Sequence, residues 1–259
     1  MRHIINKTDA IVLRIFPYSN TSHIVRWLTA DFGKLTTIVK GACRPKSRFL
    51  GQYDLFYTCD LLFYSRDHGG LHIIKEASPQ KTRKSFRSDW KASFIASYVC
   101  DLASRVTASG HHQPELYTLI DRTLDFLCTE TADTAFLFWL ELKLMQTLGF
   151  APQLQYCFAC HTNLSAIGSD QSHFSYAGGG ILCSACAQRQ RYDSRQISSD
   201  VLNILRNLQN IDLPPKSANS QSDSSRSAEL ASLLGLFLQY HLDYKPISRN
   251  ILMELIAGN

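Results

Sequence analysis

The sequence predicts an α+β protein, with a five-stranded barrel at the N-terminus followed by an α-helical domain into which a four-cysteine module is inserted. Three observations support this. The first eighty residues consist of short strand-like segments, apolar residues after Pro79 recur at helical spacing, and two CxxC pairs interrupt the helical part. We expect the barrel to span residues 1–80 and the helical domain residues 81–259, with the cysteine module at 153–190.

Five segments near the N-terminus are rich in β-branched, leucine and aromatic residues and are separated by glycine, proline or Asx turn signals. The expected strands are 10–16, 24–29, 35–40, 55–64 and 71–76. So many short strands in so short a segment favour a small closed barrel. The OB-fold, a five-stranded barrel that commonly binds nucleic acid, is the prediction, and an SH3-like barrel is the alternative.

Helical spacing begins after the barrel. Trp90, Phe94, Tyr98 and Leu102 recur every four residues and predict one apolar face on a first helix. Further helices are expected over 116–127, 134–148, 198–208, 230–240 and 251–256. The segment 134–148 is apolar on nearly every side, so we expect it to be the buried central helix.

Residues suited to helix ends stand at the limits of these segments. Pro114 suits the first turn of the second helix, and Gly149 can end the third. Ser198 or Ser199 can cap the next helix, and Ser248 the last. Residues 214–227 carry no large apolar side chain, and we expect them to form a flexible linker.

The composition excludes several classes of protein. Of 259 residues, 45% are hydrophobic and 19% charged, which is typical of a folded globular chain and not of a disordered one. The N-terminus lacks an apolar run of signal-peptide length, and the longest apolar stretch, 135–148, is interrupted by Glu141 and Lys143 and is too short to cross a bilayer. We therefore expect an intracellular protein without a membrane span.

Four of the eight cysteines form two matched pairs, Cys157-Phe-Ala-Cys160 and Cys183-Ser-Ala-Cys186, separated by twenty-two residues. A two-residue gap lets both thiolates of a pair face one ion, and two pairs complete the closed tetrahedral shell of a structural Zn²⁺ site. The glycines at 178–180 predict a hairpin turn between the pairs. Reduced cysteines in a loop, or a redox dithiol, are the alternatives.

The remaining cysteines, Cys43, Cys59, Cys100 and Cys128, lack such pairing, and we expect reduced, partly buried thiols. His161 directly follows the first pair and is expected to lie on the surface, with replacement of a thiolate ligand as the alternative. The sequence contains no GxSxG, HExxH or P-loop motif. We therefore do not expect an enzyme.

Positive charge is concentrated near the N-terminus. Residues 32–91 hold twelve Lys and Arg against five Asp and Glu, whereas the rest of the chain holds fifteen against seventeen. A local surplus of this kind attracts polyanions through counterion release, although a solvated surface is the alternative.

The order of motifs resembles that of the RecO family of bacterial recombination and repair proteins over nearly the whole chain. The resemblance rests on several short runs: Thr29–Leu35, Lys40–Ser47, Glu115–Tyr117, Leu124–Leu127, Leu148–Pro152 and Gly179–Cys183. The sequence departs from the family pattern after the first CxxC pair, where His161 stands in place of a common glycine. Histidine is tolerated because it is enriched among the non-glycine residues that adopt left-handed backbone.

The resemblance implies a recombination mediator that binds single- and double-stranded DNA, anneals complementary strands and helps load recombinase onto strands coated by single-strand-binding protein. The implied partners are RecR, the acidic C-terminal tail of single-strand-binding protein and, indirectly, RecA, and the implied location is the cytoplasm, at the nucleoid. Carried onto this chain, the DNA-binding residues are five cations: Lys34, Lys40, Arg44, Lys46 and Arg48. Weaker candidates are Arg26, Arg83, Lys84 and Arg87.

The alternative function is a zinc-bearing interaction scaffold whose basic strip docks acidic protein tails without binding DNA directly. An enzyme of unrecognised mechanism is a third possibility.

Overall fold

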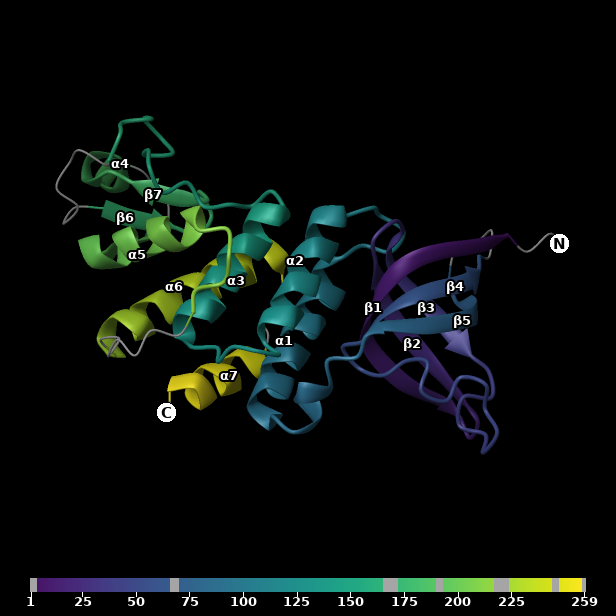
Figure 1. The fold of residues 1–259 in the computed structure, drawn as a ribbon. Helices are drawn as coiled ribbons and strands as arrows, with labels where there is room; N and C mark the ends of the chain where they lie inside the picture. The colour runs from purple at the N-terminus through teal and green to yellow at the C-terminus, as the bar shows by residue number, and fades with distance from the viewer. Residues whose placement is uncertain are drawn as a thin grey trace. The chain divides into compact units, whose positions relative to one another are not determined.

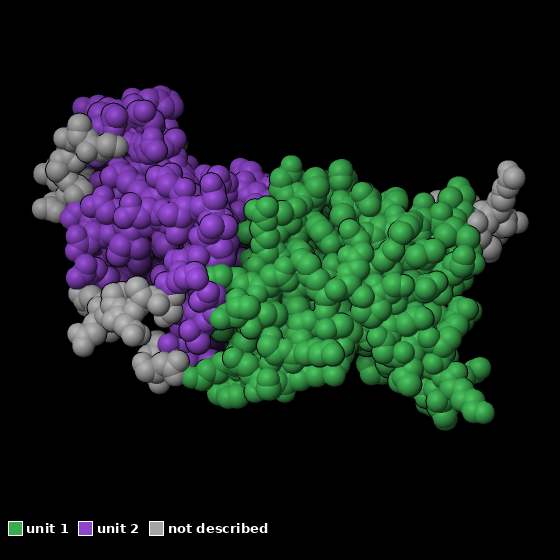
Figure 2. All heavy atoms as spheres, viewed as in Figure 1, with its two compact units in different colours: residues 1–129 green, residues 130–259 purple. Residues whose placement is uncertain are grey.

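A computed structural model describes residues 4–65, 70–164, 172–189, 193–216, 224–243 and 247–257. The chain divides into two compact units, residues 1–129 and 130–259 (Figure 2). The first two helices therefore belong to the same unit as the barrel, and the change from strands to helices near residue 80 does not coincide with this division. Among the described helices, none is both long and apolar enough to cross a bilayer.

The N-terminal strands form a closed barrel (Figure 1). Its strands are β1 (Ile5–Ser19), β2 (Ser22–Thr29), β3 (Gly33–Val39), β4 (Thr58–Tyr64) and β5 (His72–Lys81). They pair in the order β1-β2-β3-β5-β4, with β4 returning to β1 and only β3 and β5 running parallel. The predicted five-stranded barrel is confirmed, and its closed topology is OB-like.

The barrel encloses one apolar core. Trp27 is fully buried, and its indole Nε1–H donates to Thr37 Oγ1 at 2.9 Å, so the one polar atom of this side chain has a partner inside the core. Phe63, Leu61 and Val25 pack in the same core. Because a closed barrel has no free strand edge, its loops are held by a rigid frame.

Strand limits differ from prediction, most of all in β1, which runs over Ile5–Ser19 where 10–16 was expected. At two other limits the backbone gives the reason. β4 begins at Thr58 and not at Leu55, because Phe56 has a φ of 67°, in the left-handed region that no strand residue adopts. β5 extends to Lys81 and so includes Pro79. The proline is tolerated there because the β4–β5 register shifts beside its partner, Cys59.

Two α-helices complete the first unit. Helix α1 (Trp90–Val106) is capped by Asp89, whose carboxylate accepts a hydrogen bond from the Ala92 amide at 3.0 Å. Helix α2 (Pro114–Phe126) has its proline in the first turn, as predicted. The expectation that Trp90 lies on the buried face of α1 is wrong: it is the first residue of the helix and is 65% exposed.

The second unit is built around helix α3 (Thr134–Thr147), the predicted central helix, of which nine residues are buried. After its end, Gly149 adopts a φ of 82°, the amide of Gly149 donates to Gln146 and that of Phe150 donates to Met145. This is a Schellman motif, which confirms the predicted end of the helix. Other elements of this unit are β6 (Ser172–Ser175), β7 (Gly180–Leu182), α4 (Ser184–Arg189), β8 (Ser194–Ile197), α5 (Ser199–Asn210), α6 (Ser224–Leu242) and α7 (Ile247–Ala257).

Two details of the C-terminal part differ from prediction. Helix α7 begins at Ile247, so Ser248 lies inside the helix and does not cap it. Helix α6 begins at Ser224, so the last four residues of the predicted linker, 224–227, are helical. Residues 214–216 have no regular structure, and residues 217–223 lie outside the described residues.

A buried ion pair joins three helices of the second unit. The guanidinium of Arg249, on α7, donates to both carboxylate oxygens of Glu141, on α3, at 2.6 and 2.9 Å. It also donates to the carbonyl of Ala231, on α6, at 2.9 Å. Gly235 makes room for it, because a Cβ at that position would lie 2.7 Å from Arg249 Nη1.

This pair gives a test of the packing. The substitution Arg249→Met should lower the free energy of unfolding by about 3–5 kcal/mol, because it removes the guanidinium that pairs with both oxygens of the buried Glu141 carboxylate. The double substitution Glu141→Leu with Arg249→Met should cost far less, since it removes both charges of the pair. Urea denaturation followed by circular dichroism measures both. A double variant at least as unstable as the single one would contradict the role given to the pair.

Candidate functional site

Four of the five predicted DNA-binding cations lie on one loop. We define the basic loop as residues 40–51, between β3 and β4; Lys40, Arg44, Lys46 and Arg48 are all exposed on it. Within the part of the chain that the structure describes, no ion pair involves any of these four side chains. The positive charges of the basic loop are thus available to an external anion.

The backbone of the basic loop is held against the barrel. The Cys43 amide donates to the Thr21 carbonyl in the β1–β2 turn at 3.1 Å. The side chain of Gln52 donates to the Arg48 carbonyl and accepts from the Ala77 amide of β5, both at 3.0 Å. Phe49 is buried in the barrel core, and the guanidinium of Arg48 lies 4.7 Å from the centre of its ring. The cations are therefore carried on an anchored segment.

The structure does not bring Lys34 together with the other four cations. Lys34 stands near the start of β3, whereas the basic loop follows its end. Its ammonium donates to the Ser104 carbonyl of α1 at 2.7 Å. Burial, and then the charges of Arg26 and Arg105, lower the pKa of Lys34 below its usual range.

The weaker candidates differ in their surroundings. Arg26 donates to the Ser104 hydroxyl at 3.0 Å, and Arg87 pairs with the exposed Asp54 at 3.0 Å. Lys84 is exposed. The side chain of Arg83 is only 3% exposed and lies in an internal network, so the structure gives it another role.

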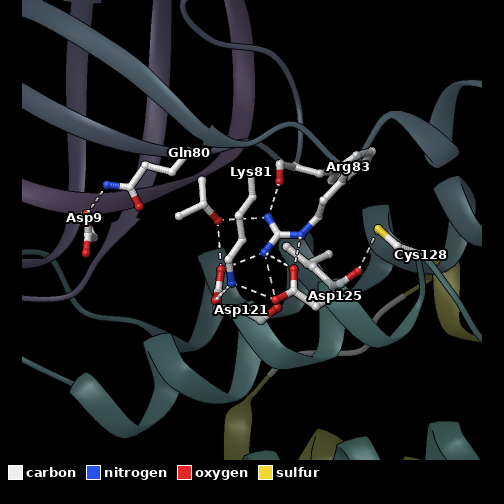
Figure 3. A network of polar contacts seen from close by, with 10 residues as sticks. Asp9, Gln80, Lys81, Arg83, Asp121, Asp125 and Cys128 are labelled. Atoms are coloured by element: carbon white, nitrogen blue, oxygen red, sulfur yellow. Dashed lines mark hydrogen bonds and ion pairs between the residues drawn. The ribbon is translucent and has the colours of Figure 1, made fainter.

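Arg83 connects the barrel to helix α2 (Figure 3). Its guanidinium donates to the Phe56 carbonyl at 2.6 Å, to the Thr58 hydroxyl at 2.9 Å and to Asp121 on α2 at 2.6 Å. Its Nε donates to Asp125 at 2.9 Å. The backbone of Arg83 has a φ of 40°, which is costly for a residue with a side chain and is held by these contacts.

Lys81 adds a second positive charge to this network, because its ammonium donates to both Asp121 and Asp125. Burial by itself would raise the pKa of Asp121, but hydrogen bonds from Lys81, Thr58 and Arg83 lower it below its usual value of 3.8. Sequence reasoning missed this network. The available signal was the spacing of four between Asp121 and Asp125, which places two carboxylates on one helix face.

The four paired cysteines meet in the second unit. One Sγ atom from each of Cys157, Cys160, Cys183 and Cys186 lies within 4.8 Å of all the others. The distance from Cys160 Sγ to Cys183 Sγ is 3.8 Å. Four such atoms at this spacing can hold one metal ion.

Local backbone structure explains how the two pairs meet. After the first pair, His161 has a φ of 60°, the left-handed conformation that the sequence comparison predicted for this position. The His161 amide donates to the Cys157 carbonyl at 2.8 Å, which closes the turn. The predicted hairpin is formed by β6 and β7, and Cys183 follows β7 directly. Cys186 lies on the short helix α4.

The thiols of this cluster influence one another. Hydrogen bonds from Thr162 lower the pKa of Cys160 to about 6, whereas those with Cys183 and Cys160 raise the pKa of Cys186 to about 12. Opposite shifts are expected when several acidic groups share one small volume, because ionising one opposes ionising the next. A bound cation would offset this repulsion between neighbouring thiolates. His161 is not part of the four-atom cluster.

Comparison with known proteins identifies the family. The model described as "Recombination protein O N terminal" matches residues 1–83, and that described as "Recombination protein O C terminal" matches residues 87–250. The chain belongs to the RecO family. The resemblance seen in the sequence is thereby confirmed, and the family includes DNA repair proteins by name.

Full-length relatives support this membership. DNA repair protein RecO of Chlorobium limicola is 29% identical over 255 residues, covering 96% of this chain and 97% of the relative. The proteins of the same name from Prosthecochloris aestuarii and Halalkalibacterium halodurans are 27% and 26% identical, and the alignments cover 94–96% of this chain and 94–95% of those proteins. The chain therefore aligns with these RecO relatives almost end to end.

The Arg83 network gives a prediction about pH. Because the folded state depresses the pKa of Asp121 below 3.8, its contribution to stability is present above that value and is lost as the pH falls through the folded pKa. The substitution Asp121→Asn should lower the free energy of unfolding at pH 7 by about 2–3 kcal/mol and make its fall between pH 5 and pH 2, roughly, shallower than in the wild type.

Urea denaturation over this pH series measures both effects. Asp54→Asn is the matched control, because Asp54 pairs with Arg87 at an exposed position and should change stability little. Identical pH slopes in wild type and Asp121→Asn would count against the network.

Proposed function

We propose that this RecO-family protein is a recombination mediator that binds single- and double-stranded DNA through the basic loop and anneals complementary strands. The proposal includes help in loading recombinase onto strands coated by single-strand-binding protein. The observation that carries it is the set of four exposed cations, Lys40, Arg44, Lys46 and Arg48, on an anchored loop of an OB-like barrel. These side chains have no internal countercharge among the described residues.

The chemistry of the basic loop suits a phosphate backbone better than a particular base sequence. Lysine and arginine neutralise phosphates and release condensed counterions, which gives affinity that falls steeply with salt. Contacts of this kind position a strand without reading it. A mediator that must act on any damaged sequence needs this lack of preference.

Lys34 belongs to the proposed DNA face in a lesser role. To bind a phosphate, the Lys34 ammonium must give up its hydrogen bond to the Ser104 carbonyl. Its pKa is also lowered, first by burial and then by the charges of Arg26 and Arg105. We therefore propose that it contributes less than each cation of the basic loop.

The proposed partners follow from family membership. They are RecR, the acidic C-terminal tail of single-strand-binding protein and, indirectly, RecA, in the cytoplasm at the nucleoid. The proposed mediator is not an enzyme, since placing and annealing strands requires binding and no covalent step.

A second candidate function uses the same loop. An acidic protein tail presents carboxylates that the four cations would also attract, which is the scaffold hypothesis without direct DNA binding. Charge reversal of Lys46 and Arg48 discriminates the two: on the proposed function DNA binding is lost, whereas on the scaffold hypothesis only tail binding is lost.

We also propose that the four-cysteine cluster holds Zn²⁺ in a structural role. Four thiolates favour zinc over hard cations such as Mg²⁺, and four ligands fill its tetrahedral shell, leaving no position for substrate. All four cysteines belong to the second compact unit, whereas the basic loop belongs to the first. The metal is therefore proposed to stabilise the second unit and not to contact DNA.

Salt titration tests DNA binding. Fluorescence anisotropy with labelled single-stranded DNA should show affinity that falls as salt rises, and replacing Lys46 and Arg48 with Gln should reduce the slope of log affinity against log salt by about 1–2. Lys216→Gln is the matched control, since this cation is exposed but already paired with Glu130 at 2.7 Å. Absence of binding at low salt, or binding indifferent to salt, would refute the proposal.

Metal removal tests the zinc site. Chelation, or the substitution Cys183→Ser, should abolish one bound zinc per chain and lower the melting temperature, with much less effect on DNA affinity. Mass spectrometry for metal, thermal melting and anisotropy measure the three quantities. Cys128→Ser is the control and should leave metal content unchanged, because Cys128 stands outside the cluster. Equal losses of stability and DNA affinity would contradict the assigned role.

A further inference from the structure

Three polar side chains form a connected group at the base of the basic loop. Cys43 Sγ lies 3.2 Å from Nε2 of His23, and Nδ1 of the same ring lies 2.9 Å from the hydroxyl oxygen of Tyr53. A nucleophile, a base within hydrogen-bonding distance and a third group that orients the base form the arrangement that activates cysteine in proteins. We propose that Cys43 is a reactive thiol, modified by anionic low-molecular-mass disulfides.

The backbone and core of the barrel hold these three side chains in place. His23 lies on β2, and the Cys43 amide donates to Thr21 in the turn just before that strand. The ring of Tyr53 packs edge-on against both His23 and the buried Trp27, each with ring centres 6.2 Å apart. The sulfur is thus fixed to the β1–β2 turn, and the imidazole to the core.

The geometry lets His23 take up the thiol proton while its ring stays held by Tyr53. Once Nε2 has accepted that proton, Nε2–H faces the Cys43 sulfur and Nδ1–H faces the Tyr53 oxygen. Burial, and then the nearby Cys43, raise the pKa of Tyr53 to about 12, so the phenol remains neutral and orients the ring without competing for the proton.

The other cysteines outside the four-cysteine cluster do not combine exposure with a neighbouring histidine. Cys59 and Cys100 are buried, and burial raises the pKa of each to about 12. Cys128 is partly buried just after helix α2, and its thiol donates to the Leu124 carbonyl of that helix at 3.3 Å. Cys43 is exposed, which differs from the partly buried thiol expected from the sequence.

The charge of the basic loop selects the reagent. Lys40, Arg44, Lys46 and Arg48 all stand within five residues of Cys43 and have exposed side chains. A positive environment raises the local concentration of anions. An anionic disulfide is therefore favoured over a neutral or cationic one. Oxidised glutathione, which carries several carboxylates, is a suitable probe.

The reaction is thiol–disulfide exchange. The Cys43 sulfur attacks one sulfur of the disulfide while His23 holds the proton, the sulfur–sulfur bond of the reagent breaks, and a new one forms to Cys43. The departing thiolate takes up the proton from His23 and leaves as a thiol. One disulfide is consumed and one is formed, so no net oxidant beyond the reagent is needed.

A functional consequence rests on the proposed DNA binding. The adduct places negative charge and bulk among the four cations of the basic loop, which opposes contact with phosphates. Modified protein should therefore bind single-stranded DNA more weakly, and reduction should restore the affinity. The basic loop would then couple DNA binding to the thiol–disulfide balance of its surroundings.

Peptide mass mapping tests the site on the full, metal-loaded protein treated with oxidised glutathione. Cys43 should form the mixed disulfide about tenfold faster than Cys128 or more, and His23→Gln should slow the Cys43 reaction by about tenfold. Tyr53→Phe removes only the orienting hydroxyl and should give a smaller decrease. A destabilised variant would expose Cys59, Cys100 and Cys128 and speed their reactions, whereas loss of the base slows Cys43 alone.

The outcomes are separable. Modification of Cys43 no faster than that of Cys128, or unchanged in both His23→Gln and Tyr53→Phe, overturns the site. For the consequence, modified wild-type protein should lose about fivefold or more of its affinity for DNA, and Cys43→Ser treated identically should lose none. If untreated protein fails to bind DNA, the proposed function is overturned. The mass-mapping result still decides whether Cys43 is the reactive thiol.

Discussion

The buried guanidinium of Arg83 holds the barrel to the helices that follow it. It reaches the carbonyl of Phe56 and the hydroxyl of Thr58 on the barrel side, and Asp121 and Asp125 on α2 (Figure 3). A cation with so little exposure is tolerable only when its charge is balanced and its donors are used, as they are here. The junction between the barrel and α2 therefore includes a charge network in addition to apolar packing.

The surface at which the proposed function resides belongs to the same barrel. The same barrel anchors the basic loop through Phe49, Gln52 and the amide of Cys43, so its cations project from a fixed base. A fixed array of charges binds a flexible polyanion with less ordering cost than a mobile one. The proposed reactive thiol uses the same anchoring, because its distance to His23 depends on the β1–β2 turn.

The second unit is stabilised by contacts between distant parts of the chain. Its central helix carries Glu141 in a buried position, which requires Arg249 from more than a hundred residues later in the chain. Its cysteine module closes by a hairpin and by a left-handed turn at His161. Both features join segments that are far apart in the chain, the first by a buried ion pair and the second by bringing together two pairs of cysteines.

The sequence by itself determined the elements whose causes are local: the barrel strands, the apolar helix ending at Gly149, the proline start of α2, and the paired cysteines whose spacing suits one ion. The tertiary structure alone decided which charged side chains form ion pairs inside the protein and which stay exposed. Arg83 and Arg48 are the same residue type in basic stretches of the sequence, yet only Arg83 meets carboxylates when α2 packs on the barrel, while Arg48 stays exposed. In the same way only folding brings His23 to Cys43, because twenty residues separate them in the chain. Periodicity and turn chemistry act over a few residues, whereas side-chain partners are set by packing across the whole chain.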